Sequence, residues 1–137
     1  MATRARIGIQ NDDGTIRSVY HHWDGYPEWL GKTLRQHFET RDKVNTLIDG
    51  GDMSSCRTNL GFNNESREET APLYYSERGE NCPPKVNDSF DDYMMEFGAG
   101  EEYNYLFVVD EWKCYKLRGV MPDEPLYTEK VIPEGNL

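Results

Sequence analysis

The amino-acid sequence predicts an α+β fold, in which an antiparallel sheet built from an N-terminal and a C-terminal β-hairpin carries about three helices on one face. Strand-like runs come in pairs near the two ends of the chain, and the helical patterns lie between them. The chain has no glycine-rich phosphate loop of the kind found in nucleotide-binding folds. Its 137 residues fit one compact domain, which we expect over residues 1–118, followed by an extended or partly disordered tail over residues 119–137.

The first hairpin is predicted from alternation and turn chemistry. Residues 4–10 carry Ile7 and Ile9 at a spacing of two, as a half-buried strand does. An Asn-Asp-Asp-Gly turn occupies residues 11–14, and β-branched and aromatic residues resume over residues 15–23. This pattern predicts two antiparallel strands.

Two helices are expected next. Pro27 suits the first turn of a helix that runs to about Phe38, with an apolar stripe formed by Leu30, Leu34 and Phe38. Thr40 is placed to cap a second helix, which Gly50 ends and whose apolar stripe is Val44, Leu47 and Ile48.

The middle of the chain has weaker patterns. Residues 52–71 are polar and predict a surface excursion, residues 71–75 a strand, and residues 76–87 a loop. Ser89 is placed to cap a third helix that ends before Gly98 and buries Phe90, Tyr93, Met94 and Phe97.

The clearest strand signal is the second hairpin. Residues 103–109 and 112–117 are rich in aromatic and β-branched residues and are joined by a short acidic connection. Apolar residues fall on both faces of this hairpin, which predicts a central position in the sheet. Three prolines in the tail argue against a further element there.

The net charge of −10 disfavours a general nucleic-acid or membrane binder. All of the acidic excess lies after residue 50. One interpretation is a well-solvated surface, and the other is an acidic face that meets a basic partner or imitates DNA. The carboxylates that would stand in for phosphates are Glu96, Glu101, Glu102, Asp110 and Glu111.

The cysteines and the chain ends give no sign of a cofactor or of export. Cys56, Cys82 and Cys114 lack metal-binding spacing, so we expect reduced thiols and assign them no role. The chain has no apolar run that would span a membrane and no secretion signal, and this predicts a cytoplasmic protein. Because no metal-ligand spacing or phosphate-loop motif is present, we expect no cofactor or metal.

One motif is unusually dense: Tyr-His-His-Trp-Asp-Gly-Tyr-Pro at residues 20–27, where a strand meets a helix. One hypothesis makes it a folding device, with Asp24 capping the helix and the aromatic residues packing it against the hairpin. The alternative is a contact surface or small pocket, with candidate binding residues Tyr20, His22, Trp23, Asp24, Tyr26 and Trp29. A metal site would need His22, Asp24 and a third ligand such as His37, a combination that no spacing supports.

A longer pattern surrounds this motif. The chain carries Thr3-Arg4, Ile7-Gly8-Ile9, Asp13-Gly14 and then Ser18-Val19-Tyr20-His21-His22-Trp23-Asp24-Gly25-Tyr26-Pro27. It resembles a family of small proteins of unknown function, widespread in tailed bacteriophages and prophages, that carry a Ser-x-Tyr-x-His-Trp-Asp-Gly-Tyr-Pro motif. The likeness is dense up to Ser55 and patchy beyond it. The resemblance implies a phage origin and no particular activity.

These observations lead to one function hypothesis and one alternative. We expect a phage-encoded acidic accessory protein, without enzymatic activity, that acts in the host cytoplasm. It would bind a host protein and inhibit or modulate it, in host takeover or in anti-defence such as anti-CRISPR or anti-restriction. Host proteins that bind nucleic acid are among the candidate partners, with DNA mimicry as one route. The alternative is a small enzyme or ligand-binding protein that uses the surroundings of His22 and Asp24. Direct contact with nucleic acid or membrane is not expected, and a homodimer stays open.

Overall fold

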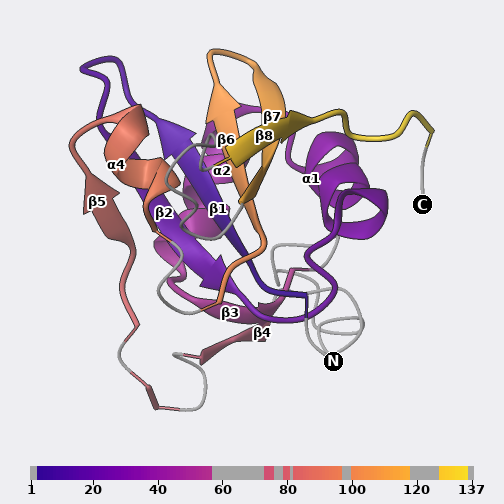
Figure 1. Ribbon diagram of the computed structural model, residues 1–137. Helices are drawn as coiled ribbons and strands as arrows, with labels where there is room; N and C mark the ends of the chain where they lie inside the picture. Colours follow the sequence, from indigo (N-terminus) through magenta and orange to yellow (C-terminus); the bar gives the residue numbers. More distant parts are fainter. Residues whose placement is uncertain are drawn as a thin grey trace.

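A computed structural model describes residues 3–56, 73–75, 79–80, 82–96, 100–117 and 127–135. These residues form one mixed sheet with the strand order β4-β3-β2-β1-β6-β7-β8, and β5 pairs with β2 (Figure 1). The strands are β1 (Ala5–Gln10), β2 (Ile16–His21), β3 (Met53–Ser55), β4 (Leu73–Tyr74), β5 (Lys85–Asn87), β6 (Tyr103–Val108), β7 (Glu111–Leu117) and β8 (Tyr127–Lys130). The helical segments are η1 (Pro27–Gly31), α1 (Lys32–His37), α2 (Arg41–Asp49) and α4 (Phe90–Met94). The predicted α+β class is confirmed.

Both predicted hairpins are present, and they meet at the centre of the sheet. Strands β1 and β2 are antiparallel, as are β6 and β7. The two hairpins join through β1 and β6, which run parallel, with Ile7 opposite Tyr105. The sheet is therefore mixed, whereas the sequence predicted antiparallel pairing. The reason is that a long connection through the helices separates the hairpins, and such a crossover allows the second hairpin to enter in the same direction as β1.

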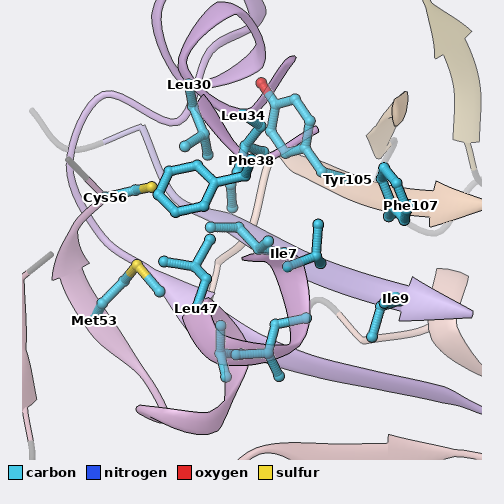
Figure 2. Close-up of a cluster of buried hydrophobic side chains, with 14 of the residues drawn as sticks. Ile7, Ile9, Leu30, Leu34, Phe38, Leu47, Met53, Cys56, Tyr105 and Phe107 are labelled. Carbon is cyan, nitrogen blue, oxygen red and sulfur yellow. The ribbon is translucent and has the colours of Figure 1, made fainter. Parts of the chain in front are cut away.

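Helices η1, α1 and α2 cover one face of the sheet, as predicted. Their apolar residues meet those of β1 and β6 in the main core, whose labelled members in Figure 2 are Ile7, Ile9, Leu30, Leu34, Phe38, Leu47, Met53, Cys56, Tyr105 and Phe107. Pro27 opens η1, a π-helical segment that continues directly into α1. Thr40 caps α2 by accepting a hydrogen bond from the Lys43 backbone N–H at 3.2 Å, which confirms the predicted cap.

The short helix α4 lies against the opposite face. Ser89 caps it by accepting from the Asp92 N–H at 3.2 Å, again as predicted. A Cβ on Gly8 of β1 would lie 2.8 Å from the Tyr93 hydroxyl oxygen, so only glycine allows α4 to approach this closely. This second core consists of Ile16, Tyr93, Met94, Leu106 and Tyr115.

Part of the predicted tail is a further element of the sheet, which corrects the expectation for residues 127–135. Strand β8 pairs with β7, with Lys130 opposite Cys114. Ile132 is buried in the main core, and the Arg35 guanidinium donates to the backbone oxygens of Ile132 and Gly135 at 3.1 and 2.9 Å. Pairing with a free sheet edge and hydrogen bonds from an arginine on a helix both depend on residues that are distant in the sequence. The proline content of the tail gives no information about such partners.

Two short strands were also missed, β3 in the expected excursion and β5 in the expected loop. The rest of the excursion, over residues 57–71, lies outside the described residues, as do the tail residues 119–126 and 136–137. Helix α4 ends at Met94, with Met95 as its C-cap, so it is shorter than the predicted helix, and Phe97 lies outside the described residues. Among the helices that are described, none has the length and apolar character needed to cross a membrane.

Candidate functional site

The dense motif forms a tightly held turn between β2 and η1, which we call the aromatic turn (residues 22–26). Its backbone is fixed at three points. The Trp23 N–H donates to the Ser54 oxygen at 2.9 Å, and the Gly25 N–H donates to the Thr3 oxygen at 2.8 Å. The Gly25 oxygen accepts from the Tyr105 hydroxyl at 2.7 Å. A Cβ on Gly25 would lie 2.7 Å from the Thr3 oxygen, so this approach requires glycine.

The aromatic turn presents two large side chains to solvent. Trp23 is 48% exposed and Tyr26 is 36% exposed. The Trp23 ring packs edge to face against the His22 ring, with centroids 4.6 Å apart. The Tyr20 hydroxyl lies 2.7 Å from His22 Nδ1, and burial raises the pKa of this phenol. Tyr20, His22 and Trp23 therefore form one connected row at the surface.

The neighbouring His21 points the other way, into the main core. It is fully buried, and its Nε2 accepts a hydrogen bond from the Cys56 backbone N–H at 2.9 Å. Burial lowers the pKa of His21 to about 3, and the adjacent His22 adds to this effect. His21 is therefore a neutral structural residue. Trp29 lies beside it, with ring centroids 6.5 Å apart, and packs against the main core.

Asp24 does not cap the following helix, which corrects that part of the folding hypothesis. The N-cap of η1 is Tyr26, and no side chain accepts a hydrogen bond there. Asp24 instead occupies the left-handed region with a φ of 58°. Aspartate tolerates this conformation better than most residues because its short polar side chain can bond locally. The role of Asp24 in the turn is therefore to adopt this left-handed conformation.

Two hollows of the described structure lie away from the aromatic turn. The described residues form hollows of about 240 and 410 Å³, and no residue of the aromatic turn lines either of them. Within the described part of the chain, no group of three or more histidine, cysteine, aspartate or glutamate side chains is placed to hold a metal ion. The three cysteines are free thiols.

The five predicted surface carboxylates do not form a continuous strip. Glu101 is only 5% exposed and lies 3.1 Å from the Arg6 guanidinium, which corrects its assignment to the surface. The buried Arg6 needs this counter-ion. Glu96 is paired with Lys85 at 3.0 Å.

The remaining three are exposed but lie apart. Glu102 precedes the six-residue β6, whereas Asp110 and Glu111 follow it. A strand of that length separates its ends by about 20 Å. The candidate acidic surface is therefore split between the two ends of the second hairpin.

No protein-family model matches the chain, and neither the curated proteins nor the solved structures yield a match. The resemblance to phage proteins stays a prediction from the motif, and the functional argument depends on the geometry of the aromatic turn.

Proposed function

We propose that the chain is a phage-encoded accessory protein that binds a host protein through the aromatic turn and inhibits or modulates it, as in host takeover or anti-defence. The observation that carries this proposal is the exposure of Trp23 and Tyr26 on a backbone fixed by three hydrogen bonds. Tryptophan and tyrosine dominate the energetics of protein interfaces. A rigid backbone lowers the entropy that is lost when such residues become buried in a complex.

The side chains near the turn favour binding over covalent catalysis. Burial raises the pKa of the Cys114 thiol to about 12 and raises that of Cys56 as well, so neither is a ready thiolate nucleophile. The Nδ1 atom of His22 lies 2.7 Å from the Tyr20 hydroxyl, whose pKa is raised by burial. A catalytic histidine base is instead oriented by a carboxylate, which is not the partner of Nδ1 here. These features support a non-enzymatic role over the alternative built on His22 and Asp24.

The positions of the carboxylates favour contact with a protein surface over imitation of DNA. A DNA mimic needs negative charges in rows with the spacing of phosphates. Here Glu101 and Glu96 are paired with cations, and the exposed carboxylates lie at opposite ends of the second hairpin. We therefore place the contact at the aromatic turn.

Affinity capture from bacterial lysate tests this proposal. The baits are the wild-type chain, the double variant Trp23→Ala/Tyr26→Ala and a control, Val86→Ala/Val131→Ala, that removes two other exposed apolar side chains. We expect the wild type and the control to retain the same bacterial protein and the double variant to lose it. Retention that is equal for all three baits, or no retention by the wild type, would refute the proposal.

A further inference from the structure

The larger of the two hollows lies between the turns of the two hairpins and the start of α2. Its volume of about 410 Å³ falls within the range of small-molecule binding sites. Its lining residues are Gln10, Asn11, Asp12, Gly14, Arg41 and Val109. Gln10 is the last residue of β1, whereas Thr3, which accepts from the Gly25 N–H of the aromatic turn, precedes that strand. The hollow and the aromatic turn are therefore separate sites at opposite ends of β1.

Arg41, the first residue of α2, is held in a fixed position on the wall of this hollow. Its guanidinium donates to the backbone oxygen of Gln10 and, at 3.3 Å, to that of Val109. Its Cζ atom lies 5.9 Å from the centre of the Phe107 ring, which belongs to the main core. A guanidinium has more N–H donors than these two bonds use. Arg41 is thus ordered in advance for a carboxylate, the group that its planar donors match.

Asp12 lines the same hollow and carries the opposite charge, but it does not pair with Arg41. Neither residue forms an ion pair with the other or with any other described residue. Asp42 and Asp110 follow Arg41 and Val109 in the chain and, although they do not line the hollow, they add negative charge beside it. These carboxylates oppose a ligand that has only negative charge. The best complement has a carboxylate for Arg41 and an ammonium group for Asp12.

Val109 lines the hollow in an unusual backbone conformation. Its φ is 59°, a region that a β-branched residue rarely adopts. Its side chain is 73% exposed, so burial in a core does not compensate for the strain. Strained residues of this kind cluster at binding and active sites. An exposed isopropyl group at the hollow offers apolar surface to a ligand.

We propose that this hollow binds a free amino acid with an apolar side chain. Arg41 binds its α-carboxylate, Asp12 binds its α-ammonium group, and Val109 contacts its side chain. Each charge of the ligand then meets an oppositely charged group that lacks an ion-pair partner in the described protein, and such charge-assisted hydrogen bonds are the strong ones. This site goes beyond the proposed function and does not depend on it.

Titration with leucine and two analogues tests the proposal. 4-Methylpentanoate lacks the ammonium group of leucine, 3-methylbutylamine lacks its carboxylate, and both keep its apolar part. The readout is the backbone N–H NMR signals of Gly14 and Val109, with the Trp23 indole N–H as a remote signal that should not move. We expect leucine to shift both backbone signals and to bind at least about tenfold more tightly than either analogue. Equal binding of the three compounds, or no saturable shift with leucine, would overturn the proposal.

The deciding variant is Asp12→Asn, because the Asp12 side chain is exposed and forms no bond with a described residue. It should weaken leucine binding at least about tenfold and leave 4-methylpentanoate binding undiminished, since only the ammonium group loses its partner. Asp88→Asn removes the same charge from an exposed position before α4 and should leave the affinity for leucine nearly unchanged. Equal effects of the two variants would contradict the assignment of Asp12.

Val109→Gly separates a role in binding from a role in folding. Glycine relieves the strained backbone, so the variant should be more stable than the wild type. It also removes the apolar contact, so it should bind leucine about threefold more weakly. Unchanged affinity in this variant would contradict the contact with Val109. The capture experiment with the Trp23→Ala/Tyr26→Ala bait reports on the aromatic turn alone, so each proposal can fail without the other.

Discussion

Acidification should destabilise the fold through the buried His21. The side chain is fully buried and its Nε2 accepts a hydrogen bond from the Cys56 N–H, so the folded state holds it neutral with a pKa of about 3. In the unfolded chain a histidine has a pKa of about 6.5. Between these two values the unfolded chain binds one more proton than the folded protein, so the free energy of unfolding falls as the pH falls. From pH 7 to pH 5 the loss is about 2 kcal/mol.

Urea unfolding followed by tryptophan fluorescence at pH 7, 6 and 5 measures this loss. His21→Gln keeps an acceptor for the Cys56 N–H but cannot titrate, so its stability should change little between pH 7 and pH 5. His22→Gln is the matched control and should keep most of the loss. Burial raises the pKa of Asp52, and this carboxyl stabilises the fold on acidification, with the opposite sign, near the acidic end of the range. Wild-type stability that is the same at pH 7 and pH 5, or a loss that persists in His21→Gln, would refute the reasoning.

Three further changes test particular contacts by the same unfolding measurement. Val109→Gly should stabilise the fold by about 1 kcal/mol, because valine has a φ of 59° there and is 73% exposed; a loss of stability would contradict this. Asp24→Ala should cost about 1 kcal/mol and Asp24→Gly almost nothing, because position 24 is left-handed; equal costs for the two variants would contradict this explanation. Glu101→Ala should cost about 3 kcal/mol by leaving Arg6 buried without a counter-ion, whereas the double variant Arg6→Met/Glu101→Leu should recover much of that loss; equal losses would contradict the pairing.

Local signals in the sequence were sufficient for the elements that depend on local chemistry. The Thr40 and Ser89 caps are confirmed because each serine or threonine hydroxyl bonds a backbone N–H three residues later. The first hairpin follows from alternation and a turn sequence, and its register pairs Ile7 with Val19. Each of these features is determined by residues that are only a few positions apart in the sequence.

Features that depend on distant partners could not be predicted in the same way. The short β5 carries little strand pattern of its own and exists because it pairs with β2. Arg6 lies within an alternating strand, but α4 and its surroundings cover that face, so the arginine needs a buried glutamate 95 positions later in the chain. At the candidate site the motif predicted the cluster of Tyr20, His22 and Trp23, but it did not show which of the two adjacent histidines is buried.

The most direct test of the account is photo-crosslinking from the aromatic turn. A photoreactive p-benzoylphenylalanine would replace Trp23 in one version of the chain and Val131 in a second, and bacterial cells producing each version would be irradiated. We predict a covalent adduct with one bacterial protein from position 23 and no such adduct from position 131. The same adduct from both positions, or none from position 23, would contradict the claim that the exposed aromatic turn binds another protein.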